Sequence, residues 1–286
     1  MSAIENPFID VLFVTYRSPE RAKLALDRLL EISEGRFRIW VWHNGDHEET
    51  MRIPQRAHEL GLLHRFHHSE ENVRLIPAMN WVFREGTLPY VTKIDDDAIM
   101  PPGWPGPIID AHENDPRLGV VGSWRFHPSD FEPELASKKL QIMGGGHIVM
   151  RNAWTEGTSF VMKRACIDDI GLIPESSSFP TYCLDLTRQK WINGYHYPFV
   201  RYGNLDDPRD PDTLIHSDED LLERMPLSVK ANSLGTADEL VAQLRRSAIT
   251  VQTAPYRGKD WSGWRQLLRR ARRRALRFIT RDNRRW

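Results

Sequence analysis

The chain has 286 residues, of which 40% are hydrophobic, and its 39 basic side chains balance its 39 acidic ones. Two cysteines are too few for a disulfide framework, and no uncharged apolar run approaches the roughly 20 residues that cross a bilayer. These properties exclude a disulfide-stapled secreted domain and an integral membrane protein, and they indicate a globular protein of the cytoplasm.

The first predicted unit is a strand, a helix and a second strand. The apolar run Ile9–Tyr16 is rich in β-branched and aromatic residues, which predicts a buried strand. Ser18-Pro19-Glu20 then predicts a helix start, with an N-cap, a proline in the first turn and an acid near the positive end of the helix dipole. After Gly35, the segment Phe37–Trp42 predicts a second strand. This order is typical of parallel strands joined by a right-handed crossover.

The next part of the chain continues the alternation of strands and helices. Residues 50–61 and 78–85 predict helices, a short strand is expected within 62–68, and Tyr90–Ile94 predicts a strand. In open α/β sheets, ligands bind at the carboxyl ends of parallel strands. Polar side chains follow three of the predicted strands, and we expect these loops to meet at one edge: Thr15-Tyr16-Arg17, His43-Asn44-Gly45 and Asp95-Asp96-Asp97.

The three consecutive aspartates predict a cation site. Alternation along an extended backbone would place Asp95 and Asp97 on one side and Asp96 on the other. Adjacent carboxylates repel one another unless a cation lies between them, and two oxygen ligands suit Mg²⁺ or Mn²⁺, which complete their shells with water and phosphate. An isolated triplet could equally be a solvated acidic turn, but the neighbouring polar loops favour the metal.

The second half of the chain predicts further strands and helices around a longer irregular stretch. Helices are expected near 108–113, 164–170 and 181–193, and strands near 118–123, 154–162 and 195–202. Residues 206–212 are rich in aspartate and proline and predict a mobile loop. Together these elements predict an α/β fold with a mostly parallel central sheet flanked by helices.

The C-terminal tail differs in charge from the rest of the chain. Residues 257–286 hold eleven arginines and one lysine against two aspartates, a balance of +10. Within 261–279 the apolar residues recur at helical spacing between arginines, which predicts a basic amphipathic helix. We therefore divide the chain into a globular domain, 1–255, and a tail, 256–286. An anionic membrane surface is the expected partner, packing on the acidic body is the alternative, and no specific nucleic acid is expected.

The order of these elements resembles the family-2-type glycosyltransferases of the GT-A fold over roughly residues 9–200. The first strand and its loop look like the nucleotide-holding segment of that family, and the other motifs of the family have counterparts. These are Val41–Asp46 for "D-N-G-S" with His43 in place of the usual Asp, Glu71–Asn80 for "N-x-G-x-x-x-A-x-N" without its Gly, Ile94–Asp97 for D-x-D, and Gly171–Glu175, Leu184–Leu186 and Gly194-Tyr195 for "G-x-F-D-E … E-D-x-D-L … G-Y".

The resemblance implies a GT-A-type nucleotide-binding fold and a metal-dependent, inverting transferase that uses a nucleotide sugar. It implies Mn²⁺ or Mg²⁺ as the cofactor, held by Asp97, Asp95 and a late histidine, His216. UDP is the commonest donor nucleotide among similar proteins, but His43 leaves GDP and dTDP open. The residues implied for nucleotide-sugar binding are Thr15, Tyr16, Arg17, Asn44, Arg74, Asp95 and Asp96.

The general base is where the chain departs from the family. Tyr182-Cys183 stands where "Glu-Asp" is usual, and a thiol with a pKa near ~8.5 is a poor oxygen base. Asp185 is the nearest carboxylate, although an Asp in a first helical turn is also common for structural reasons. Glu156 is the next candidate. By analogy the acceptor is a glycan or a lipid-linked glycan, which would fit membrane association of the tail and a role in polysaccharide biosynthesis.

Two other functions are compatible with the same residues. The missing acid at Cys183 is compatible with a non-catalytic protein that binds nucleotide sugars or glycans. A sugar nucleotidyltransferase is less favoured, because the segment Thr15–Glu20 lacks the glycines of a phosphate-binding loop.

Overall fold

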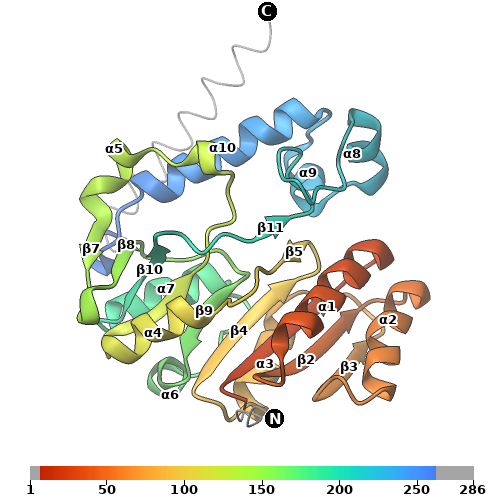
Figure 1. Cartoon of the computed structure of the whole chain (residues 1–286), viewed down its shortest axis with the longest axis horizontal. Coiled ribbons are helices and arrows are strands. Elements are labelled where there is room, and N and C mark those ends of the chain that lie inside the picture. The colour runs from red at the N-terminus through yellow and green to blue at the C-terminus, as the bar shows by residue number, and fades with distance from the viewer. Residues whose placement is uncertain (1–6, 262–286) are drawn as a thin grey trace, which may run out of the picture.

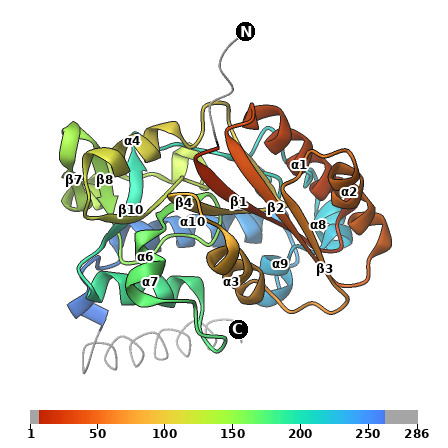
Figure 2. The same cartoon turned by 90° about the horizontal axis from the view of Figure 1, so that it is seen from below.

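The computed structural model describes residues 7–261, which form a nine-stranded sheet with helices on both of its faces (Figures 1 and 2). The strands lie side by side in the order β3-β2-β1-β4-β9-β6-β10-β8-β7. Their bounds are β1 (Ile9–Thr15), β2 (Phe37–Asn44), β3 (Arg65–Ser69), β4 (Tyr90–Asp95), β6 (Leu118–Gly122), β7 (Leu140–Ile142), β8 (Ile148–Arg151), β9 (Phe160–Lys163) and β10 (Ile192–Tyr197).

Strand direction divides the sheet into two halves. The strands β3, β2, β1 and β4 are all parallel, as the βαβ pattern predicts. β9 then runs antiparallel to both of its neighbours, β4 and β6, while β10 is parallel to β6 and antiparallel to β8. The prediction of an α/β fold with a large central sheet is confirmed, and its parallel run covers the strands that carry the polar loops.

Helices cover the two faces because the strands are apolar on both sides. Val11 and Phe13 of β1 pack in one core cluster with residues of α1, α2 and α4, whereas Leu12 and Val14 pack in another with α3, α6 and α7. The helices are α1 (Pro19–Ser33), α2 (Glu48–Glu59), α3 (Ile76–Glu85), α4 (Gly106–Asn114), α5 (Pro133–Ala136), α6 (Ala165–Ile170), α7 (Phe179–Arg188), α8 (Asp218–Arg224), α9 (Leu227–Asn232) and α10 (Ala237–Thr253).

The register of the parallel strands brings their ends to one edge. Val14 is paired with Asp95, and Thr15 is paired with His43. The loops that follow β1, β2 and β4 therefore start at the same level, which confirms the expected meeting of the polar loops at one edge of the sheet.

One helix boundary differs from the prediction. The helix expected over 181–193 ends at Arg188, and β10 begins at Ile192. Gly194, expected to end the helix, lies inside β10, where a Cβ atom would come within 2.4 Å of the carbonyl oxygen of Met150. The glycine is thus explained by the close approach of β8 rather than by a helix end.

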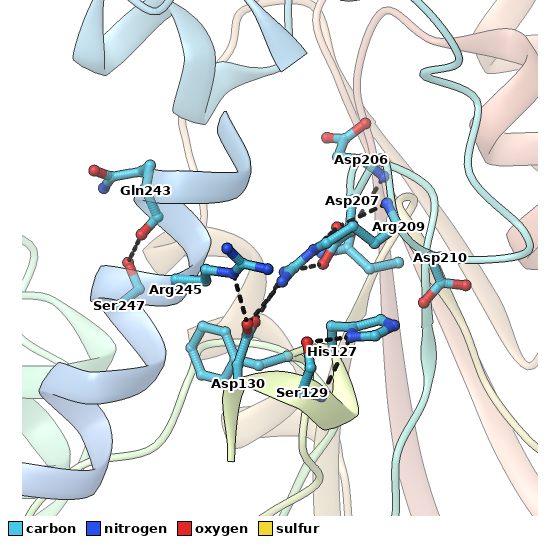
Figure 3. A network of polar contacts seen from close by, with 12 residues as sticks. His127, Ser129, Asp130, Asp206, Asp207, Arg209, Asp210, Gln243, Arg245 and Ser247 are labelled. Carbon is cyan, nitrogen blue, oxygen red and sulfur yellow. Dashed lines mark hydrogen bonds and ion pairs between the residues drawn. The ribbon is translucent and has the colours of Figure 1, made fainter. Parts of the chain in front are cut away.

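The segment predicted as a mobile loop, 206–212, is instead packed. It follows a two-stranded sheet formed by β5 (Ala98–Ile99) and β11 (Gly203–Asn204), and Asp207 and Asp210 within it are 1% and 3% exposed. Arg209 donates to both carboxylate oxygens of Asp130 at 2.7 and 2.8 Å and to Asp207 at 2.8 Å (Figure 3). The prediction was wrong because aspartates that receive guanidinium and amide hydrogen bonds can be buried.

The tail lies almost entirely outside the described residues. Only 256–261 of the segment 256–286 is described, so the predicted amphipathic helix over 261–279 and the domain boundary stay predictions. Within residues 7–261, no helix combines the length and the hydropathy needed to cross a bilayer.

Candidate active site

A cleft of about 930 Å³ opens at the carboxyl ends of β1, β2 and β4. The strand loops and the first turn of α1 form one side of it, and residues of α8, α9 and α10 form the other. Eight of the residues singled out in the sequence line this cleft together: Thr15, Tyr16, Arg17, Asn44, Arg74, Asp95, Asp96 and Asp97.

The loop after β1 is held against the neighbouring strand ends. Thr15 Oγ1 lies 2.9 Å from His43 Nδ1, within hydrogen-bond distance, and the backbone N–H of Tyr16 donates to Asp96 Oδ2 at 3.0 Å. Arg17 has a φ of +47° and its guanidinium lies 5.2 Å from the centre of the Tyr16 ring. This left-handed backbone is uncommon for arginine and turns the loop at the mouth of the cleft.

The predicted nucleotide contact Asn44 has its amide occupied by the protein itself. Its Oδ1 accepts from Trp42 Nε1 at 3.1 Å, and its Nδ2 donates to the carbonyl oxygen of Arg74 at 3.2 Å. Arg74 has a φ of +66°, so Asn44 supports a turn that an arginine backbone rarely adopts. The geometry makes Asn44 a residue that positions Arg74 at the cleft.

The three aspartates do not continue the strand as the alternation predicts. Asp95 ends β4, and Asp96 and Asp97 form a turn that leads into β5. Lys93, which is 1% exposed, makes an ion pair with Asp95 Oδ1, and the carbonyl oxygen of Asp97 accepts from the N–H of Leu205 at 2.9 Å. The turn thus gathers three carboxylates at one end of the cleft and joins them to the segment after β11.

Burial and mutual repulsion change the acidity of two of these carboxyls. Burial raises the pKa of Asp96 well above its ordinary value, and the Asp97 carboxylate raises it further. Burial also raises the pKa of Asp97, with Asp95 adding to the effect and Arg125, Arg21 and Lys93 opposing it. A divalent cation would relieve this repulsion, so the residues fit one.

The described residues offer a metal ion only part of its ligands. Within residues 7–261, no group of three or more His, Cys, Asp and Glu side chains is arranged to hold a metal ion. A cation beside Asp95 and Asp97 would therefore need further oxygens from a ligand or from water. Mg²⁺ and Mn²⁺ usually complete their coordination in this way at phosphate sites.

Three other predicted residues are not among those that line the cleft. His216 is exposed, and its backbone N–H donates to Asp220 Oδ2 at 2.8 Å. Asp185 lies on α7 in a partly exposed ion pair with Arg188. Glu156 makes an ion pair at 3.5 Å with Arg125, and Arg125 does line the cleft, so Glu156 lies one side chain behind its surface.

Tyr182 and Cys183 belong to the core. The hydroxyl of Tyr182 donates to the carbonyl oxygen of Gly171 at 2.8 Å, and Cys183 is fully buried. Burial raises the pKa of the Cys183 thiol to about 12, so it stays protonated at neutral pH. Neither residue is available to accept a proton in the cleft.

Four charged residues beside the aspartates were not among the predicted site residues. Arg21, Arg125 and Asp206 line the cleft, and Lys93 is buried beneath the aspartates. Two of them left a signal in the sequence: Lys93 interrupts an otherwise apolar strand, and Arg21 occupies the first turn of the helix that starts at the cleft. Arg125 and Asp206 lie in irregular segments, where no pattern places a side chain.

Comparison with known proteins agrees with this geometry. The sequence profile of glycosyl transferase family 2 matches residues 10–167, which is more than half of the chain. Among curated proteins, none matches the chain at the level of sequence.

Several solved structures share the fold at low sequence identity. A mannosyltransferase from Pyrobaculum calidifontis, PcManGT, in complex with GDP-Man and Mn²⁺, is 18% identical with a TM-score of 0.55 over 87% of this chain and 71% of its own. TarS from S. aureus is 14% identical with a TM-score of 0.55, over 88% of this chain and 45% of its own. GalNAc-T7 with UDP, GalNAc and Mn²⁺ is 12% identical with a TM-score of 0.53, over 70% of this chain and 44% of its own.

The chain thus spans less than half the length of TarS and of GalNAc-T7. At these identities the likeness establishes the GT-A fold and no more. Family membership comes from the sequence match, which runs from β1 into α6 and includes the three aspartates. The chain belongs to glycosyl transferase family 2, and it is a glycosyltransferase.

Proposed function

We propose that this glycosyltransferase is metal-dependent and inverting, and that it moves a sugar from a nucleotide sugar to a hydroxyl group of a glycan or a lipid-linked glycan. The observation that carries the proposal is the placement of Asp95, Asp96 and Asp97 in the same cleft as Thr15, Tyr16 and Arg17. Complexes of similar folds with GDP-Man and Mn²⁺ and with UDP and Mn²⁺ support a nucleotide donor and a divalent ion.

In this proposal the residues at the strand ends of the cleft bind different parts of the nucleotide sugar. Thr15, Tyr16 and Arg17 face the nucleoside, and Arg74, whose turn Asn44 holds, faces phosphate. Asp97 and Asp95 would hold Mn²⁺ or Mg²⁺, which when bound supplies positive charge to the departing diphosphate. The Lys93 ion pair engages one oxygen of Asp95, and in this proposal the other oxygen would meet the metal ion. His216 is exposed and does not line the cleft, so we assign the metal ion to Asp95 and Asp97 without His216.

For the general base, Glu156 is better placed than Asp185. Glu156 is bound to Arg125, which lines the cleft, whereas Asp185 pairs with Arg188 on α7. In an inverting transfer, the base takes the proton of the acceptor hydroxyl while the oxygen of that hydroxyl forms a bond to the anomeric carbon. The bond from the anomeric carbon to the nucleoside diphosphate breaks, and the diphosphate leaves with the bonding electrons. UDP-sugars are the expected donors, with GDP- and dTDP-sugars as competitors.

Hydrolysis of nucleotide sugars tests the proposal. With Mn²⁺, the protein should release nucleoside diphosphate from one sugar nucleotide of a UDP, GDP and dTDP panel, and both chelation by EDTA and the change Asp97→Ala should abolish the release. The exposed change Asp27→Asn, in a surface ion pair of α1, is the matched control and should keep the rate. Release that survives both EDTA and Asp97→Ala would contradict metal dependence.

A non-catalytic role in binding nucleotide sugars is the second candidate. It is favoured by one observation, the buried, protonated Cys183 at the place where the family usually has its base. Tight binding of a nucleotide sugar without turnover, even with a range of glycan acceptors present, would support this role against the transferase.

A further inference from the structure

Three charged side chains from distant parts of the chain meet beside the aspartates. Arg21 comes from the first turn of α1, Arg125 from the segment after β6, and Asp206 from the segment after β11, and all three line the cleft. Leu205 is tied to Asp97 through a backbone hydrogen bond of 2.9 Å, which brings the next residue, Asp206, to the aspartates. The side chains of Arg21 and Asp206 are only 11% and 13% exposed, and they form an ion pair.

These side chains have polar atoms that the protein leaves unsatisfied. The Nε atoms of Arg21 and of Arg125 are buried and have no hydrogen-bond acceptor within the protein. Arg21 Nη2 is paired with Asp206 Oδ1, so the buried atoms that lack a partner here are the two Nε donors of Arg21 and Arg125. An unpaired buried donor lowers the stability of the fold, and a fold tolerates it where a ligand provides the partner.

The packing of the loop keeps Asp206 apart from the ion pairs of its neighbours in the chain. Its neighbour Asp207 is bound to Arg209, and Arg209 is bound in turn to Asp130. In Figure 3 the carboxylate of Asp206 points away from the guanidinium of Arg209, on the other side of the loop from this network. The network therefore fixes the backbone of the loop and presents Asp206 to the cleft.

The mixture of donors and acceptor restricts the chemistry of the ligand. A phosphate would accept from the two guanidinium groups but would be repelled by Asp206, which is not one of the proposed metal ligands. A hydroxyl group can accept from an arginine and donate to an aspartate at the same time. Neighbouring hydroxyls on one ring would satisfy all three side chains.

We propose that Arg21, Arg125 and Asp206 bind the hydroxyl groups of the transferred sugar. The inference rests on the proposed function, because the proposed function assigns the diphosphate to Asp97 and the nucleoside to Thr15–Arg17. Asp97 lies within electrostatic reach of all three side chains, which places them beside the diphosphate where the sugar is attached. Asp206 and Arg21 then select the donor sugar by the configuration of its hydroxyl groups.

Paired binding measurements test this inference. With Mn²⁺ present, dissociation constants are measured by calorimetry for the nucleotide sugar that stabilises the native protein most in a thermal-shift panel, and for the same nucleoside diphosphate without sugar. Asp206→Asn, and Arg21→Lys, which keeps the charge but loses the forked donors, should weaken binding of the nucleotide sugar about 10–100-fold, the size of one or two charge-assisted hydrogen bonds. Binding of the nucleoside diphosphate should change less than about twofold.

The outcomes separate this inference from the proposed function. Asp27→Asn should leave both constants unchanged, and thermal melting should show that the cleft variants are folded. If Asp206→Asn and Arg21→Lys change both ligands equally, or change neither, the sugar assignment is wrong while the nucleotide site stands. If the native protein binds no nucleotide at all, the proposed function fails together with this inference.

Discussion

At the scale of single residues, the site combines groups that sequence patterns identify with groups that only the fold assembles. Asp95, Asp96 and Asp97 could be predicted as a cluster because they follow a predicted strand directly. Asp206 could not be predicted, because it reaches the cleft through the pairing of β11 with β5, two strands of two residues each. Asn44 could be placed at the cleft but not given its role, since its amide bonds to Trp42 and Arg74 depend on tertiary structure.

The base assignment predicts a contrast between three variants. Glu156→Gln should lower the rate of transfer by about 10²–10⁴-fold, the usual contribution of a general base. Asp185→Asn and Cys183→Ala should keep the rate within about threefold, because Asp185 is paired with Arg188, which does not line the cleft, and the thiol of Cys183 is buried and protonated. Initial rates with saturating donor and acceptor provide the comparison, and a larger loss in Asp185→Asn than in Glu156→Gln would reverse the assignment.

His43 predicts a loss of stability in mild acid. Its ring is fully buried, and burial, with His68 and His47 nearby, lowers its pKa from 6.5 to about 4. Because the unfolded chain takes up the proton near pH 6.5 and the folded protein only near pH 4, stability falls as the pH drops from 6.5 toward 4. The stabilisation lost by pH 5 is about 2 kcal/mol for this residue.

Urea unfolding of the native protein and of His43→Asn at pH 7 and pH 5 measures this loss of stability. The native protein should lose about 2 kcal/mol more than the variant between the two pH values, and other buried histidines cancel in the difference. Equal losses in the two proteins would show that His43 does not titrate as proposed.

At the scale of elements, regular patterns were predicted well and polar packing was not. The strand and helix pattern from β1 to β4 could be predicted because apolar runs, caps and glycines all indicate the same elements. The helices α8, α9 and α10 were missed, although Ser217 and Thr236 cap α8 and α10 with hydrogen bonds at 3.2 Å. The loop 206–212 was predicted as mobile because composition cannot show that Arg209 neutralises two buried aspartates.

The network around Arg209 predicts a large effect on stability. Arg209→Met leaves Asp207 buried without its guanidinium and leaves Asp130 only the longer contact with Arg245 at 3.6 Å, and breaking a buried pair in this way costs about 3–5 kcal/mol. Lys23→Met, in the exposed pair with Asp27, is the control and should cost less than about 0.5 kcal/mol. Free energies of unfolding from urea titrations test the contrast, and a small loss in Arg209→Met would mean that water replaces the guanidinium.

At the scale of the whole molecule, the fold class followed from the order of elements, and the cleft followed from the ends of the parallel strands. The second wall of the cleft could not be predicted, because it is formed by residues of α8, α9 and α10, which lie far from the aspartates in the sequence. The tail adds a charge of +10 to a body of −10, and its role is predicted from sequence alone.

The tail predicts binding to anionic membranes. The full chain should cosediment with vesicles that contain anionic lipid and should release at high salt, since each basic residue near such a surface contributes about 1 kcal/mol. Replacing Arg269, Arg270, Arg272, Arg273 and Arg274 by Gln should abolish cosedimentation. Equal binding of native protein and variant, or of neutral and anionic vesicles, would remove the membrane as the partner.

In the proposed mechanism, a cation links Asp95 and Asp97 to the diphosphate of a nucleotide. Anomalous scattering from crystals grown with Mn²⁺ and the bound nucleotide locates the metal directly. We expect a manganese peak within coordination distance, about 2.0–2.3 Å, of a carboxylate oxygen of Asp97 and of the diphosphate oxygens. A nucleotide bound in the cleft with no manganese between it and the aspartates, or one bound elsewhere on the protein, would contradict it.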